Sequence, residues 1–347
     1  MTGFSVDPGG LNGLYNLLAR AADAAYDTLD YTRRQCDLPW NAEGLLMILL
    51  GPHEHAYANV TGALARLHEL AQDTGTAVNA AQNDYLRTDR AVAARLDAVR
   101  GVPAPGPADV PSRPAGFADV ADPARFLTAP AYPVPIVMWS INPLEDLLSP
   151  AAWLRQIAIW LFGHDPFEGW AKQFSGDWNA YVHCGAALAR VGASVHDIGG
   201  NLVAGAAEVG TVWRGDAADR EREYQVALGS AATGLQAACT AYSGLYAQAA
   251  EVTKSLFDVA GDLIGDLFDL LIVVNAAAAV GTAMVETGIG AIAGYGIAAY
   301  YAVQAYELYQ KIARFYSIAD DMIKAIGASV GAVRAELAVR DLPALPR

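Results

Sequence analysis

Apolar residues repeat every seven positions along two neighbouring stretches of the chain, and this repeat restricts the available folds more than any other feature of the sequence. One stretch ends before Trp213 and the other begins after it. Each carries two parallel apolar rows, the pattern of a helix packed lengthwise against another helix. One row on each side consists of Tyr181, Leu188, Val195, Leu202 and Val209, then Leu228, Leu235, Tyr242, Ala249 and Leu256. The sequence therefore predicts an antiparallel helical hairpin over residues 170–256.

A second pair of helices is predicted at the start of the chain. Residues 11–36 and 53–99 contain no proline, and Pro39 and Gly44 between them mark a turn. The longer stretch keeps the seven-residue spacing throughout, in the row Leu64, Ala71, Val78, Tyr85, Val92 and Val99. We expect residues 1–100 to form another antiparallel hairpin.

Proline separates the two hairpins. Eleven of the 17 prolines lie between residues 101 and 150, where they remove backbone donors and fix φ. Residues 101–169 are therefore predicted to be a linker, ending in a short amphipathic stretch that contains Trp153, Trp160 and Trp170. Residues 257–347 are rich in alanine and glycine and are predicted to be an apolar helical region. The predicted fold class is all-α.

Two uncharged runs in the last region, 270–285 and 287–306, are separated by Glu286 alone. Each is close to the roughly 17–25 residues that span a bilayer. Two interpretations remain open: a helical hairpin that inserts in a membrane with its turn at Glu286–Gly288, or two helices buried in a bundle with the other hairpins. The weakly hydrophobic Ala- and Gly-rich composition favours burial in a bundle.

The balance of charge excludes one class of partner. The chain has 37 acidic and 23 basic side chains and a formal net charge of −14. Affinity for nucleic acid comes from clusters of lysine and arginine, so no nucleic acid is expected to bind. Residues Met1–Gly13 have no basic residue and no long apolar core. A cleaved secretory signal is therefore not expected.

No arrangement of residues predicts catalysis, a metal or a cofactor. His53 and His55 face different ways on a helix, and no third ligand of suitable spacing lies nearby. His183 and Cys184 are adjacent helical residues that diverge, and Cys184 lies on an apolar row. No serine, histidine and aspartate constellation can be assigned. We expect a protein that is not an enzyme.

The cysteines allow a structural prediction. If the second hairpin turns at Trp213–Gly215, Cys184 and Cys239 lie on facing arms within about half a turn of register. They are expected either to form a disulfide in an oxidising exterior or to remain two separate buried thiols. Cys36 has no partner in either case.

The turn of the second hairpin, Trp213-Arg214-Gly215 followed by Asp216-Ala217-Ala218, carries a resemblance to a known family. Two long antiparallel arms joined at Trp-x-Gly resemble the WXG superfamily of actinobacterial type VII secretion substrates. The resemblance covers about residues 1–100 and 170–255. Gly215 supplies a residue without Cβ for the bend, and Trp213 can cover the end of the thin two-helix core.

The first hairpin resembles the same family in a degenerate form, because Trp40-Asn41-Ala42 lacks the glycine. Tyr85 and Asp89 near the end of its second arm fit the Tyr-x-x-x-Asp/Glu pattern that the family uses in its export signal. Their spacing places both side chains on one helix face. The alternative interpretation is that Tyr85 is a core residue and Asp89 a solvated neighbour.

The resemblance implies a non-enzymatic substrate of type VII secretion that acts by protein–protein association. The implied partners are the secretion ATPase and a second copy or another WXG-type protein. The implied location is outside the cell or at the cell envelope, and the alternative is the cytoplasm. A second functional interpretation is a membrane-inserting or pore-forming protein that uses residues 270–306.

Overall fold

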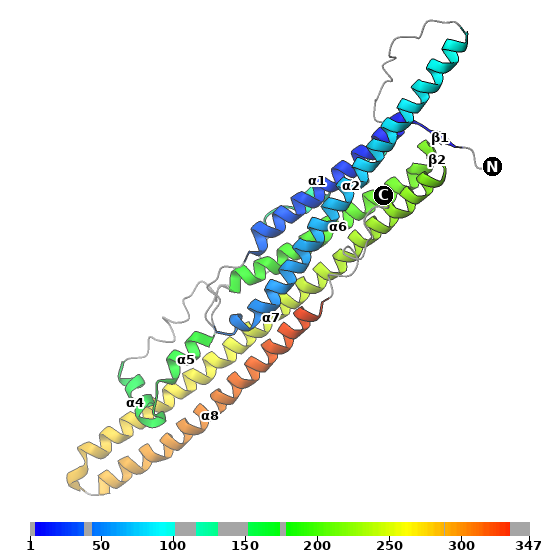
Figure 1. Ribbon diagram of the computed structural model, residues 1–347. Helices are drawn as coiled ribbons and strands as arrows, with labels where there is room; N and C mark the ends of the chain where they lie inside the picture. The colour runs from blue at the N-terminus through cyan, green and yellow to red at the C-terminus, as the bar shows by residue number, and fades with distance from the viewer. Residues whose placement is uncertain are drawn as a thin grey trace.

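Long helices make up almost all of the part of the chain that the computed structural model describes, which is residues 4–37, 44–100, 116–130, 152–173, 178–287 and 289–333. The predicted all-α class is confirmed (Figure 1). The helices are α1 (Pro8–Cys36), α2 (Leu46–Arg100), α4 (Ala152–Phe162), α5 (Pro166–Gln173), α6 (Trp178–Val212), α7 (Asp216–Ala283) and α8 (Ile289–Ala332). The remaining elements are the strands β1 (Ser5–Val6) and β2 (Trp213–Arg214) and the 3-10 turns η1 (Pro123–Phe126) and η3 (Val285–Thr287).

The helices form an elongated bundle in which sequence neighbours run antiparallel (Figure 1). α1 packs on α2, α6 packs on α7, and α1 joins the two pairs by packing on α6. The heptad residues Leu188, Val195, Leu202, Leu228 and Leu235 are buried between them. α8 returns along α7, and its last turns reach the start of α2, where Gly327 approaches Pro52.

Two of the expected segment boundaries fall inside helices. α7 continues without a break through the boundary expected between residues 256 and 257. The boundary expected between 169 and 170 lies within α5. Neither position carries a proline that would end a helix, and Gly169 does not interrupt α5. Most of the turn expected between Pro39 and Gly44, with the Trp40 motif, lies outside the described residues.

Helices α6 and α7 touch backbone to backbone at a pair of glycines. A methyl group placed on Gly199 would lie 2.5 Å from the carbonyl oxygen of Gly229 and 2.6 Å from the hydroxyl of Thr233. The neighbouring Gly200 has nothing within 4 Å of the same position. Gly199 therefore sets how closely α6 and α7 approach each other, and Gly200 does not.

Replacing Gly199 with alanine should lower the free energy of unfolding by about 1–3 kcal/mol, because the methyl group overpacks the α6–α7 contact. Gly200→Ala is the matched control and should raise the same free energy by about 0.5–1 kcal/mol, since alanine favours a helix over glycine. Urea denaturation followed by circular dichroism measures both. Equal stability of the two variants would contradict the close contact.

Residues 116–130, which we call the strap, lie within the predicted linker but are docked on the bundle. On the α6 side, the backbone N–H of Phe117 donates to Glu208 Oε2 at 2.8 Å. Asn201 Oδ1 accepts from the backbone N–H groups of Val120 and Ala121, and its amide nitrogen donates to the Ala121 carbonyl at 2.9 Å. These bonds satisfy backbone groups that helix or sheet would otherwise satisfy.

The strap is also bonded to α1. Arg20 donates to the Phe117 carbonyl at 2.6 Å and forms an ion pair with Asp119 at 2.7 Å. The Tyr31 hydroxyl donates to the Thr128 carbonyl at 2.9 Å. Because the strap bonds to α1 and α6 together, it fastens the first hairpin to the second.

Helices α7 and α8 extend past the rest of the bundle at the end opposite the β1–β2 pair (Figure 1). We call residues 270–306 of this hairpin the tip. Among the described residues, one helix, α7, is long and apolar enough to cross a membrane, a property that core helices of soluble proteins share. Its most apolar 18-residue window has a mean hydropathy of 2.0, and only 28% of that window is buried.

The expectation that the two apolar runs are buried among the other hairpins is therefore wrong. Residues 284–287 leave the helical conformation of α7 between the two runs, which places a turn at Glu286 and Thr287, and Gly288 of the expected turn lies outside the described residues. α6 begins only at Trp178 and α2 only at Leu46, so neither helix reaches far enough to cover the tip. The tip helices consequently pack on each other and leave their other faces exposed.

Candidate functional site

The turn between α6 and α7 adopts a backbone conformation that requires glycine. Gly215 has φ 124° and ψ 175°, a region that residues with a Cβ avoid. Asp216 and Asp219 follow in the first turn of α7, where negative charge interacts favourably with the helix dipole. The sequence thus places Gly215 where the chain reverses between α6 and α7.

Trp213 lies in β2, immediately before that turn, and it is only 5% exposed. β2 pairs with β1 in antiparallel register, with Val6 opposite Trp213 and Ser5 opposite Arg214. The Asp7 amide extends the ladder by donating to the Val212 carbonyl at 2.7 Å. The indole is therefore held between the turn and the extended N-terminal segment.

Tyr85 meets Trp213 at this end of the bundle, although the two belong to different hairpins. Their ring centroids are 6.3 Å apart in an edge-to-face arrangement. Phe4 packs on Tyr85 as well, with centroids 5.4 Å apart. We call Phe4, Tyr85 and Trp213 the turn cluster. The structure thus brings together the tyrosine of one predicted motif and the tryptophan of the other.

Asp89 lies one helical turn beyond Tyr85 and is exposed. Beyond Asp89, every α2 side chain that the structure describes is exposed. The cause is unequal arm length: α1 begins at Pro8, whose carbonyl accepts a hydrogen bond from Gln82, and no part of α1 extends further. Among the described residues, the end of α2 is the part that projects beyond the β1–β2 pair (Figure 1).

The projecting end of α2 carries one continuous stripe of side chains. Residues spaced four and three apart lie on one face of a helix, so the positions that follow Tyr85 line up with it. We call this set the α2 stripe: Tyr85, Asp89, Val92, Leu96 and Val99. Val92, Leu96 and Val99 are between 48% and 86% exposed. The seam that pairs α2 within the bundle therefore continues without a partner in the described structure.

The N-terminal segment is the part of this site that sequence reasoning missed. Phe4 and Val6 alternate with a polar residue before Asp7, whose carboxylate accepts from the Gly9 amide and caps α1. That alternation is the only local signal of a strand. Two residues are too few to predict a strand, and the segment was expected only to lack a secretory signal.

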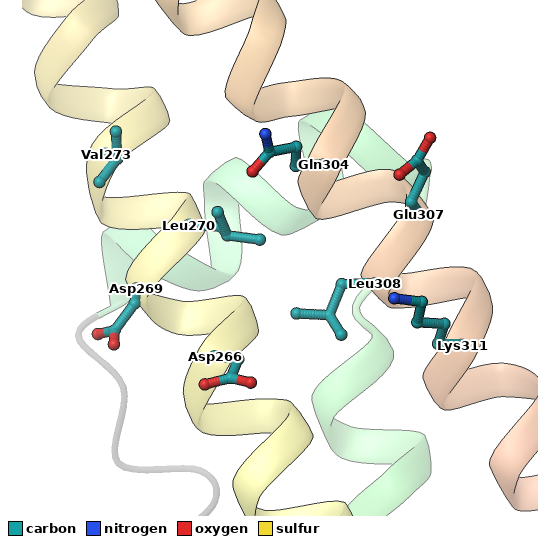
Figure 2. A pocket seen from close by; sticks show the side chains of 8 residues that line it. All are labelled: Asp266, Asp269, Leu270, Val273, Gln304, Glu307, Leu308 and Lys311. Atoms are coloured by element: carbon teal, nitrogen blue, oxygen red, sulfur yellow. The ribbon is translucent and has the colours of Figure 1, made fainter.

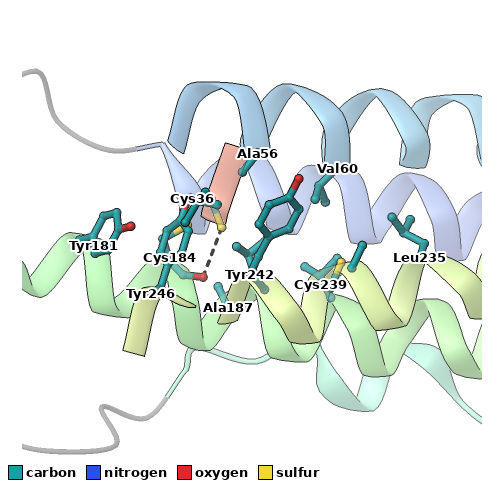
Figure 3. Packing of buried hydrophobic residues seen from close by; sticks show 14 of the residues in the cluster. Cys36, Ala56, Val60, Tyr181, Cys184, Ala187, Leu235, Cys239, Tyr242 and Tyr246 are labelled. Carbon is teal, nitrogen blue, oxygen red and sulfur yellow. Dashed lines mark hydrogen bonds between the residues drawn. The ribbon is translucent and has the colours of Figure 1, made fainter. Parts of the chain in front are cut away.

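Of the two alternatives for Cys184 and Cys239, the structure has the separate buried thiols rather than the disulfide, and all three cysteines are free and buried. Across the hairpin, Cys239 faces Gly192. Cys184 lies eight residues before Gly192, about 12 Å along the helix, whereas a disulfide needs Cα atoms within about 7 Å. The thiol of Cys36 instead lies against the Cys184 carbonyl at 3.7 Å (Figure 3). Cys184 therefore lies beside Cys36, the last residue of α1, and not opposite Cys239.

Burial makes these thiols poor nucleophiles. It raises the pKa of the Cys239 thiol to about 12 and the pKa of the Cys184 thiol well above its usual value. A thiol reacts as the thiolate, so neither residue is activated for chemistry. His183, the neighbour of Cys184, points toward α1 and bonds to Gln35 at 2.6 Å.

His53 is a core residue. It is 4% exposed, and its Nδ1 shares a hydrogen bond with the Tyr246 hydroxyl, while His55 is exposed. Burial lowers the pKa of His53 to about 4, so the ring is neutral at physiological pH. Among the described residues, no group of three or more His, Cys, Asp or Glu side chains is placed to hold a metal ion.

Comparisons of the chain with known protein families, with curated proteins and with solved structures gave no match.

Proposed function

We propose that this protein is a non-enzymatic substrate of type VII secretion, exported to the cell envelope or the medium. The observation that supports the proposal is the contact between Tyr85 and Trp213. These residues are the defining aromatic positions of two motifs that resemble those of the WXG superfamily, and they lie about 130 residues apart in the sequence. A chance match of either motif would give no reason for their rings to touch.

The proposed recognition surface is the α2 stripe. It combines a packed aromatic ring, an exposed carboxylate and three exposed apolar side chains on a helix without a partner in the described structure. A secretion ATPase that covers this face buries the apolar side chains and pairs with Asp89. The tandem hairpins supply within one chain the paired bundle that single-hairpin members of the family form by association.

Tyr85→Ala should lower the amount of protein in the medium at least about tenfold, the loss expected when one anchoring contact of about 1.4 kcal/mol disappears. Asp89→Asn should act in the same direction. Asp84→Asn is the matched control, because Asp84 is an exposed carboxylate on another face of the same helix. Immunoblots of medium and cells, with and without the secretion ATPase, measure the effect.

Circular dichroism of each purified variant separates lost recognition from lost folding. Wild-type amounts of folded Tyr85→Ala in the medium would overturn the assignment of the α2 stripe. Export of the wild type without the ATPase would overturn the proposed function itself.

A second proposed function, compatible with the first, is insertion of the tip in a membrane. It is supported by the exposed apolar surface of a hairpin whose two runs carry no charge. Washing native membranes with alkaline carbonate tests it, since inserted protein stays in the pellet. Complete release of the protein into the wash would contradict insertion.

A further inference from the structure

The tip is apolar on more than one side, and this determines what can cover it. On α8, Tyr295, Ile297 and Val303 are each about half exposed and, at 3.6 residues per turn, point in different directions. On α7, Ile272, Val273 and Val280 are also exposed. A protein partner covers one face of a hairpin, whereas lipid surrounds it. The distribution therefore favours lipid.

The tip is long enough to enter a bilayer. The run of α7 from Leu270 to Ala283 is about 20 Å long, and the run of α8 from Ile289 to Tyr306 is about 27 Å. The hydrocarbon core of a bilayer is about 30 Å thick. Gly294 packs against the backbone of Gly281, and a methyl group placed on Gly294 would lie only 2.4 Å from the Gly281 nitrogen. Such small-residue contacts bring helices together without a hydrophobic driving force between them.

The base of the tip is marked by the return of charge. Asp266, Asp269, Glu307 and Lys311 line a groove of about 530 Å³ between α7 and α8 (Figure 2). Further from the tip, α7 carries two more exposed carboxylates, Asp258 and Asp262. The boundary between apolar and charged surface therefore falls at one level on both helices.

The short helices α4 and α5 pack on the hairpin at this same level. Phe162 stacks on Tyr309 with centroids 4.5 Å apart, and it lies 6.5 Å from Tyr306, the last residue of the uncharged run. Phe167 stacks on Phe268 at 4.7 Å. These contacts fix α4 beside the boundary, and the described residues leave one of its faces uncovered.

That free face carries two tryptophans. Leu154 and Ala158 are the buried side of α4, whereas Trp153 is 44% exposed and Trp160 is 78% exposed. Their seven-residue spacing places both indoles on one face. Tryptophan is enriched where a membrane meets water, because its ring is apolar and its N–H is polar.

We propose that Trp153 and Trp160 of α4 form an interfacial collar that fixes the depth to which the tip enters a bilayer of low surface charge. The inference rests on the membrane insertion proposed above. The preference for low surface charge follows from the carboxylates at the base, which are repelled by anionic lipid; a polybasic segment would have the opposite effect.

The test uses full-length protein and flotation with vesicles of phosphatidylcholine. The wild type should float, and the double variant Trp153→Ser, Trp160→Ser should bind at least about tenfold more weakly, the loss of about 1.4 kcal/mol. Both indoles are exposed, so the variant should keep its fold. Val226→Ser, an exposed valine near the other end of α7, is the matched control and should bind like the wild type.

A tip variant, Ile292→Asn with Val303→Asn, distinguishes the collar from the tip and should abolish flotation. If it does so while the tryptophan variant floats like the wild type, the collar is overturned and membrane insertion stands. If the wild type does not float, membrane insertion fails. Adding phosphatidylglycerol to the vesicles should weaken wild-type binding, and stronger binding would overturn the preference for low surface charge.

Discussion

Replacing Phe117 with alanine should lower the free energy of unfolding by about 3 kcal/mol or more, the cost of deleting a buried phenyl ring. Phe117 is 1% exposed, and its ring lies where Leu17 of α1 approaches Gly205 of α6. The ring thus fills space between the two hairpins, at a position where the backbone has φ 59°. Removing it leaves a cavity at the junction that the strap closes.

Val120→Ala is the matched control for this prediction, because Val120 lies in the same strap and is 68% exposed. It should change the free energy of unfolding by no more than about 0.5 kcal/mol. Urea denaturation followed by circular dichroism measures both variants. If Phe117→Ala unfolds at the wild-type urea concentration, the strap contributes nothing to holding the hairpins together.

Glu221→Gln should raise the free energy of unfolding at pH 8 by about 3 kcal/mol and leave it nearly unchanged at pH 4. Burial raises the pKa of Glu221 from 4.5 to about 7 in the folded protein. Its Oε1 and both side-chain polar atoms of the nearby Gln225 have no hydrogen-bond partner among the described residues. The folded state therefore favours the protonated acid. Its contribution to the free energy of unfolding is complete below pH 4.5 and is lost as pH rises from 4.5 to 7.

The ionisation of His53 changes the free energy of unfolding in the opposite direction over nearly the same pH range. Its pKa is lowered to about 4 by burial, so its contribution is complete above the unfolded value of 6.5 and is lost as pH falls toward 4. The wild type should consequently show little pH dependence between about 4.5 and 6.5. In Glu221→Gln only the effect of His53 remains, so the free energy of unfolding should fall by about 3 kcal/mol between about pH 7 and pH 4.

Glu223→Gln controls for the loss of one negative charge, because Glu223 is exposed on the same helix. Chemical denaturation of the three proteins across this pH range gives the comparison. Parallel pH profiles for Glu221→Gln and the wild type would show that Glu221 is ionised in the folded protein at neutral pH.

The helical hairpins and their turn could be predicted because they depend on local pattern. The seven-residue rows define which faces of α6 and α7 are buried, and Gly215 is the residue type that a φ of 124° requires. The register between the arms could not be predicted as well. It depends on close contacts such as that of Gly192 with Cys239, and the half-turn offset expected between Cys184 and Cys239 is wrong for that reason.

Features that depend on the relative lengths of separate helices could not be predicted from the sequence. Nothing local shows that α1 ends its contact with α2 near Gln82, or that α6 and α2 leave the tip uncovered. The contact of Tyr85 with Trp213 also depends on how one hairpin sits on the other. The strap escaped prediction because the scattered apolar residues of a proline-rich segment, such as Phe117 and Phe126, form no helix or strand period.

The uninterrupted length of α7 has a mechanical consequence. Its 68 residues extend about 100 Å from the turn cluster to the end of the tip. Two ligands bound at these ends are held at a fixed spacing, several times the thickness of a bilayer's hydrocarbon core. The protein can therefore act as a rigid spacer between one structure bound at the turn cluster and another bound at the tip.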